Sequence, residues 1–239
     1  FLSPTAYFVL LAFQVIACLN FWQLLIELST PQFRYSSLSD PMTAYISAST
    51  PFWVALMVAV PAITMRLIAE ERSTGTIEGL LTTPVTEVEI VVAKWLAGLV
   101  MYLSMLIPFA IYLPFLYHQA KFYFDLGPLI STGIGLVSIG MMFVALGLLF
   151  SATTKVQITA AIWTFVTLFL LIALTLLLAV YAHSQQAPWE DAVRFVSVLF
   201  QMQSFGQGQL DLRFIALHLS VCILALFLTV KILEANRGR

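Results

Sequence analysis

The sequence predicts an all-α integral membrane protein with six transmembrane helices. Hydrophobic residues make up 61% of the chain and charged residues only 10%, and the mean hydropathy is +0.96. A soluble domain usually has about 25% charged residues and about 45–50% apolar residues. The chain therefore has too little polar surface to cover a water-soluble globule. Its formal net charge of -1 gives no sign of a nucleic-acid partner, and we expect the lipid bilayer to be its main surroundings.

Six stretches are long enough to cross the hydrocarbon core, which takes about 20 mostly apolar residues. They are residues 7–26, 44–68, 90–116, 129–150, 156–181 and 214–233. Pro61 and Pro108 lie inside two of them, and we expect kinks there rather than chain breaks, because neighbouring helices can satisfy the freed carbonyls. Ser131 and several glycines in the fourth stretch favour close helix packing.

The positions of Lys and Arg predict the orientation, because cytoplasmic loops carry an excess of both. An even number of spans places the two termini on one side. That side has seven: Arg66, Arg72, Lys94, Lys155, Lys231, Arg237 and Arg239. The other side has four: Arg34, Lys121, Arg194 and Arg213. We therefore expect cytoplasmic termini in a multi-pass protein of the cell (inner, cytoplasmic) membrane.

The loop from Arg66 to Glu89 holds seven charged residues. Ile77, Leu80 and Leu81 are spaced to share one face of a short helix, which Thr83-Pro84 ends because proline restricts the residue before it. Thr86, with Glu89 three residues later, is the pattern of a capping box for the next helix. Two interpretations remain open, an interfacial hairpin with its charges in water and a docking element for a cytoplasmic partner.

A second unusual segment, residues 188–205, lies between the fifth and sixth spans on the expected external side. Apolar residues at helical spacing predict an amphipathic helix there, ended by Gly206 and Gly208. Two interpretations of this helix remain open: a structural lid and an element that binds a ligand.

Nothing in the sequence indicates a catalytic or metal site. Common hydrolase, nucleotide-binding and zinc motifs are absent, and the three histidines, His118, His183 and His218, are far apart. The predicted spans have almost no ionisable residue near their middle, where coupled transporters generally carry one. Cys18 and Cys222 lie in apolar runs, and we expect both to be buried, inert thiols.

The stretch from Ala69 to Val85, AEERSTGTIEGLLTTPV, resembles the signature between the second and third spans of ABC-2 type transporter permeases. A lysine near the start of the third span, Lys94, the six-span layout and the external helix also resemble that family. The resemblance therefore covers essentially the whole chain, 1–239, as a single permease domain. The length and the Asp125-x-Gly127-Pro128 sequence resemble the gliding-motility-type permease subfamily. The chain begins at Phe1, so we expect the family's amphipathic elbow helix in residues that precede it.

The resemblance implies the transmembrane subunit of an ATP-binding-cassette exporter. Such a subunit is not itself an enzyme and binds no cofactor, since ATP and magnesium are bound by separate ATPase subunits. Two permease chains, identical or related, pair with two ATPase subunits, each docked through a coupling helix in segment 69–85. The positions that match the family's motif, and are therefore expected to contact the ATPase, are Glu70, Glu71, Arg72, Gly75, Thr76, Glu78 and Leu81. The alternatives are a non-transporting membrane scaffold or assembly subunit, and an intramembrane enzyme that would use His118 or His183.

Overall fold

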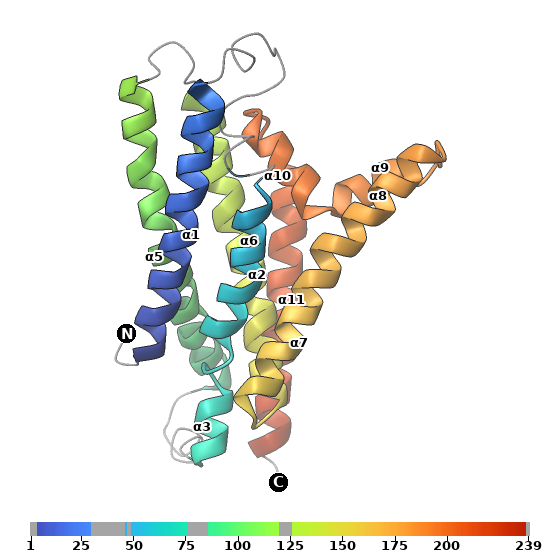
Figure 1. Cartoon of the computed structure of the whole chain (residues 1–239). Coiled ribbons are helices and arrows are strands. Elements are labelled where there is room, and N and C mark those ends of the chain that lie inside the picture. Colours follow the sequence, from blue (N-terminus) through green and yellow to red (C-terminus); the bar gives the residue numbers. More distant parts are fainter. Residues whose placement is uncertain (1–3, 30–45, 47–48, 76–85, 120–125, 238–239) are drawn as a thin grey trace. The chain divides into compact units, whose positions relative to one another are not determined.

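The structure, a computed structural model, describes residues 4–29, 46, 49–75, 86–119 and 126–237. Within these ranges the regular structure is entirely helical (Figure 1). The elements in order are α1 (Pro4–Ser29), α2 (Thr50–Thr64), α3 (Ala69–Thr74), α5 (Glu87–Gln119), α6 (Leu126–Thr153), α7 (Gln157–Phe169), the π-helix η3 (Leu170–Leu174), α8 (Thr175–Ser184), α9 (Glu190–Val196), α10 (Val198–Gly206) and α11 (Leu212–Arg237).

Helix length and composition confirm the predicted class. Among the residues that the structure describes, five helical segments are long and apolar enough to cross a membrane: Thr50–Thr74, Glu87–Pro108, Gly127–Thr153, Gln157–Ser184 and Leu212–Ala235. A shorter apolar stretch, Tyr7–Gln23, lies within α1. These segments correspond to the six expected spans, and the chain is an all-α membrane protein with about six spans.

Prolines within the spans do not end the helices that contain them. Pro61 lies inside α2, and its carbonyl accepts a hydrogen bond from the backbone N–H of Met65 at 2.9 Å. α5 continues through Pro108 and ends only at Gln119. The expectation that neither proline breaks its helix is confirmed, and the kinks stay a prediction. The second span itself is interrupted later, by a turn at residues 65–68 between α2 and α3.

The fifth span is helical throughout but contains a π-helical segment. Phe169 and Thr175, on either side of η3, both keep right-handed helical dihedrals. The Thr175 hydroxyl donates to the carbonyl of Leu171 at 2.5 Å. A π-turn inserts extra backbone into a helix without ending it, so the apolar stretch stays long enough to span the bilayer.

The prediction of one continuous helix over residues 188–205 is wrong. The structure has two helices, α9 and α10, separated at Ser197, whose dihedrals of φ -72° and ψ 114° are extended. The side-chain amide of Gln201 donates to the carbonyl of Phe195 at 2.6 Å, next to the break. Because this bond gives a carbonyl at the end of α9 a partner outside its own helix, it helps to hold the two helices at this corner.

The chain groups into two compact units, each with its own core. One comprises Phe1–Leu56, Met105–Val137 and Phe169–Ile215, and the other comprises Met57–Ser104, Ser138–Leu168 and Ala216–Arg239. In the first unit, the Phe13 and Phe52 rings meet edge to face, with centroids 6.3 Å apart. Cys18 is exposed, contrary to the expectation of a buried thiol, whereas Cys222 of the second unit is buried.

Glycines of α6 allow large side chains to lie directly against its backbone. A Cβ atom at Gly140 would collide with the ring of Tyr102, and one at Gly147 would collide with Thr64. Both partners are fully buried and belong, like these two glycines, to the second unit. A methyl group at either position would therefore displace a neighbour that has little room to move.

Candidate docking site around α3

The short helix α3 begins after a turn and ends at a glycine. The turn at residues 65–68 leads into Ala69, and Gly75 follows Thr74 in the left-handed region, with φ +75°. A Cβ atom at Gly75 would meet nothing within 4 Å. The glycine is therefore required by the backbone conformation that ends the helix and not by crowding.

The start of α3 is capped by a side chain from another helix. Ile68 is the N-cap residue but supplies no side-chain bond. Instead, the Ser151 hydroxyl of α6 accepts the backbone N–H groups of Ile68 and Ala69, at 3.1 and 3.0 Å. The same hydroxyl donates to the carbonyl of Met65 at 3.1 Å. One buried serine thus satisfies backbone groups that the turn leaves without helical partners.

Two charged side chains of α3 bind other helices of the same chain. The Glu71 carboxylate forms an ion pair with the Lys94 ammonium of α5. The Arg72 guanidinium donates to the carbonyl of Ala152 near the end of α6. Hydrogen bonds that involve an ionised group are stronger than neutral ones. α3 is therefore linked to both α5 and α6 by polar contacts.

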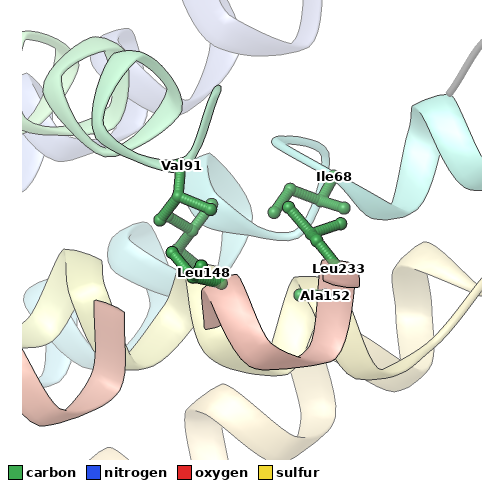
Figure 2. Close-up of a cluster of buried hydrophobic side chains, with 6 residues drawn as sticks. Ile68, Val91, Leu148, Ala152 and Leu233 are labelled. Carbon is green, nitrogen blue, oxygen red and sulfur yellow. The ribbon is translucent and has the colours of Figure 1, made fainter. Parts of the chain in front are cut away.

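An apolar cluster lies where α3 meets the long helices. Its buried members are Ile68, Val91, Leu148, Ala152, Val230 and Leu233. Figure 2 shows the side chains of Ile68, Val91, Leu148 and Leu233 directed toward one another from segments far apart in the sequence. Ile68, just before α3, is 1% exposed. Movement of α3 as a unit would therefore disturb packing against α5, α6 and α11.

The outer face of α3 is exposed and polar. Glu70, Ser73, Thr74 and Gly75 are all exposed. The hydroxyls of Ser73 and Thr74 donate to the carbonyl of Glu70 at 2.8 and 2.9 Å. These bonds are local to α3, so they leave its outer face open to a polar partner.

The family motif predicts that seven residues contact the ATPase, and the structure describes four of them. Glu71 and Arg72 bind within the chain, Glu70 is exposed, and Gly75 ends the helix. Thr76, Glu78 and Leu81 lie outside the described residues, as does the predicted apolar face at Ile77, Leu80 and Leu81. Sequence reasoning missed Ser151, since a lone serine at the end of a span has no distinctive spacing.

The predicted capping box at the start of α5 is confirmed. The Glu89 carboxylate accepts the backbone N–H of Thr86 at 2.9 Å, and the Thr86 hydroxyl accepts the N–H of Glu89 at 3.3 Å. This reciprocal pair satisfies two N–H groups that have no partner inside the helix. It fixes where α5 begins after segment 76–85.

The described residues offer no arrangement suited to metal chemistry. They contain no cluster of three or more His, Cys, Asp or Glu side chains that could hold an ion. His218 is buried in α11, with its Nδ1 3.0 Å from the Ser138 hydroxyl of α6. This contact joins two spans, as expected for a helix-packing residue. His183 lies 2.9 Å from Glu190 at the surface, and the side chain of His118 is outside the described set.

Comparison with known proteins identifies the family. A search of curated proteins found no match. The family described as ABC-2 family transporter protein matches residues 5–233, which is nearly the whole chain. The match includes α3, the residues of α5 and α6 that bind it, and the six expected spans. The chain therefore belongs to the ABC-2 transporter family, and it is a multi-pass transmembrane permease subunit of an ABC transporter.

Proposed function

We propose that the chain is the transmembrane subunit of an ATP-binding-cassette exporter whose ATP hydrolysis takes place on a separate ATPase subunit. The permease forms the substrate pathway, lies in the cytoplasmic membrane and has no catalytic activity of its own. ATP and magnesium are bound by the ATPase. Membership of the ABC-2 family supports this role, and the resemblance to gliding-motility-type permeases remains a prediction.

One observation supports the proposal most: α3 has an exposed polar face and also binds two long helices of its own chain. Its exposed face presents Glu70, Ser73 and Thr74, while Glu71 and Arg72 bind α5 and α6. A partner that binds the exposed face can move α3, and the internal contacts pass that movement to long helices. Packed helices have discrete arrangements, so a small displacement at one end can shift the balance between two states.

We propose that two permease chains, identical or related, form the working transporter. Each chain has one segment of this kind, and a pair of ATPase subunits requires two. The first and fifth spans are the proposed contact between the chains. Native mass measurement of the active complex tests this stoichiometry, because one permease chain per ATPase pair would contradict it.

Co-purification of an ATPase tests the docking role. The tagged chain would be isolated in mild detergent, and bound ATP-binding-cassette ATPase would be measured for wild type and Glu70→Lys. Glu70 is exposed, so reversing its charge should reduce recovery of the ATPase without unfolding the bundle. Glu234→Lys is the control, because Glu234 is an exposed acid near the end of α11 whose ion-pair partner, Lys231, lies on the same helix.

The recovery of the ATPase distinguishes an exporter subunit that docks through α3 from a non-transporting membrane scaffold. Reduced ATPase recovery with Glu70→Lys alone, at an unchanged melting temperature, supports docking through α3. If no ATPase binds the wild-type chain, the chain is not the transmembrane subunit of such an exporter. Equal recovery with both variants would remove Glu70 from the contact.

A further inference from the structure

A pocket of about 590 Å³ lies among α9, α10 and the start of α11, within one compact unit. Its walls include Phe195, Phe200, Phe214, Arg194, Arg213 and Gln203. Pockets of about 300–1,000 Å³ that combine aromatic walls with a few polar groups commonly bind small ligands.

The pocket lies at the edge of a membrane span. The apolar segment begins at Leu212, and Arg213 and Phe214 are its next residues. The first residues of a span lie near the boundary between the hydrocarbon core and the lipid head groups. A pocket that contains these residues is therefore level with the head groups of the surrounding lipid.

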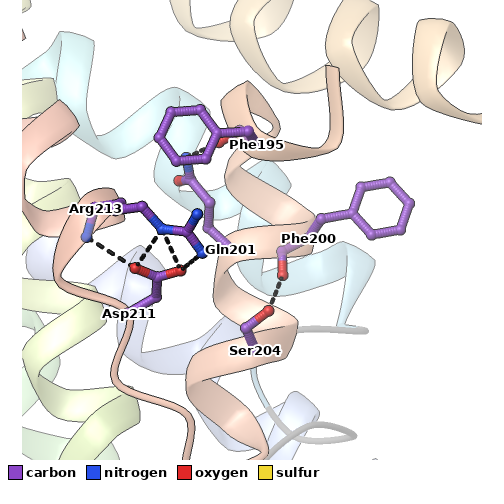
Figure 3. A network of polar contacts seen from close by, with 6 residues as sticks. All are labelled: Phe195, Phe200, Gln201, Ser204, Asp211 and Arg213. Atoms are coloured by element: carbon purple, nitrogen blue, oxygen red, sulfur yellow. Dashed lines mark hydrogen bonds and ion pairs between the residues drawn. The ribbon is translucent and has the colours of Figure 1, made fainter. Parts of the chain in front are cut away.

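Charges of both signs gather at the pocket. Arg194 lies 3.4 Å from Glu190 and stacks over the Phe200 ring at 4.8 Å. Arg213 pairs with Asp211 at 2.7 Å (Figure 3). Hydrogen bonding by the Arg213 side chain lowers the pKa of the Asp211 carboxyl below its usual range, so both groups stay ionised near neutral pH.

Both arginines retain bonding capacity beyond these pairs. A guanidinium has five N–H donors, and the Arg213 side chain directs donors from only two of its nitrogens to Asp211. Asp191 also lines the pocket and is exposed. Among the described residues its carboxylate forms no ion pair. The pocket thus offers cationic donors and a carboxylate in one place.

We propose that this pocket binds the head group of a zwitterionic phospholipid, with the phosphate at Arg194 and Arg213 and the ammonium at Asp191. Three acids, Glu190, Asp191 and Asp211, accompany the two arginines, so a purely anionic head group gains no net attraction. A head group that carries phosphate and ammonium matches both signs. The phenyl rings of Phe195 and Phe214, 5.5 Å apart, contact the glycerol and the upper acyl chain. The inference goes beyond the proposed function, because lipid can bind here whatever cargo is transported.

Native mass spectrometry of the purified chain tests the proposal. The chain in maltoside detergent would be titrated with phosphatidylethanolamine and, separately, with phosphatidylglycerol of the same acyl chains. We expect one tightly retained phosphatidylethanolamine per chain and retention of phosphatidylglycerol at least threefold weaker. Inorganic phosphate should not displace the lipid, since it has neither ammonium nor acyl chain.

Variants locate the site. Arg213→Gln and Asp191→Asn should each weaken phosphatidylethanolamine retention about threefold or more. Lys155→Gln, an exposed charge in the turn between α6 and α7, should leave it unchanged. If Arg213→Gln lowers the melting temperature, Asp191→Asn decides the result, because Asp191 forms no ion pair in the described structure.

Two results would overturn the proposal. Equal retention of the two lipids, with no effect of Asp191→Asn, would exclude recognition of the ammonium. Retention that is the same in wild type, Arg213→Gln and Asp191→Asn would place the lipid elsewhere on the chain.

Discussion

The carboxylate of Glu71 in α3 forms an ion pair with the ammonium of Lys94 in α5. Both side chains are 27% exposed, so the pair is neither fully solvated nor deeply buried. The resemblance to the family predicted that Glu71 contacts the ATPase. It also matched Lys94 to the lysine near the start of the family's third span. In the structure the two residues join α3 to the long helix α5, and we propose that movement of α3 reaches α5 through this ion pair.

Exchanging these two charges tests the ion pair. Glu71→Lys and Lys94→Glu each place like charges together, so each should lower the melting temperature of the chain and its recovery of ATPase. The double exchange restores opposite charges and should recover most of both losses. The double-mutant cycle should give a coupling energy on the order of 1 kcal/mol. Strictly additive losses would show that the pair is not formed in the membrane.

Removing the Ser151 hydroxyl should destabilise the start of α3. Ser151→Ala leaves the backbone N–H groups of Ile68 and Ala69 without the partner they have now. A buried unsatisfied group costs about 1–3 kcal/mol, and thermal unfolding in detergent should detect this loss. Ser220→Ala is the control, because Ser220 is exposed and, within the described part of the chain, its hydroxyl bonds only to the Leu217 carbonyl of its own helix. Equal melting temperatures for the two variants would contradict the capping role.

Two glycines of α6 should respond oppositely to alanine. Gly140→Ala drives a methyl group into the buried Tyr102 ring, whereas a Cβ at Gly133 meets nothing within 4 Å. Overpacking should cost about 1–3 kcal/mol at Gly140. Gly133→Ala should be neutral or stabilising by up to about 1 kcal/mol, through helix propensity. Thermal unfolding of both variants checks this, and a loss at Gly133 that matches the loss at Gly140 would argue against the close packing.

Cysteine labelling tests the expected topology. Ser73→Cys and Ser184→Cys, both at exposed positions, would be made in a background with Cys18→Ala and Cys222→Ala. An impermeant reagent added to intact cells should label the cysteine at position 184 and spare the one at position 73. The reverse pattern would invert the topology.

Local patterns in the sequence predicted much of the fold. Spans are set by runs of apolar residues, and these runs are visible without any tertiary information. The capping box at Thr86 and Glu89 was also predictable, because its two members are three residues apart and bond to each other's backbone.

Contacts between distant segments could not be predicted in this way. Ser151 lies 82 residues from Ala69, and nothing in either local sequence indicates that one caps the other. The break at Ser197 was equally hidden, because it has neither proline nor glycine beside it. The bond from the Gln201 side chain to the Phe195 carbonyl spans only six residues, but it forms only once the chain has turned at Ser197, so the sequence pattern does not indicate it.

Site-directed cross-linking measures directly whether α3 lies against an ATPase subunit, as we propose. A short bifunctional reagent, reactive toward thiols and amines, would be applied to membranes that contain the ATPase and either Ser73→Cys or Ser184→Cys in the background with Cys18→Ala and Cys222→Ala. We expect a covalent permease–ATPase product from Ser73→Cys and none from Ser184→Cys. No product from Ser73→Cys, with the ATPase still co-purifying, would contradict docking through α3.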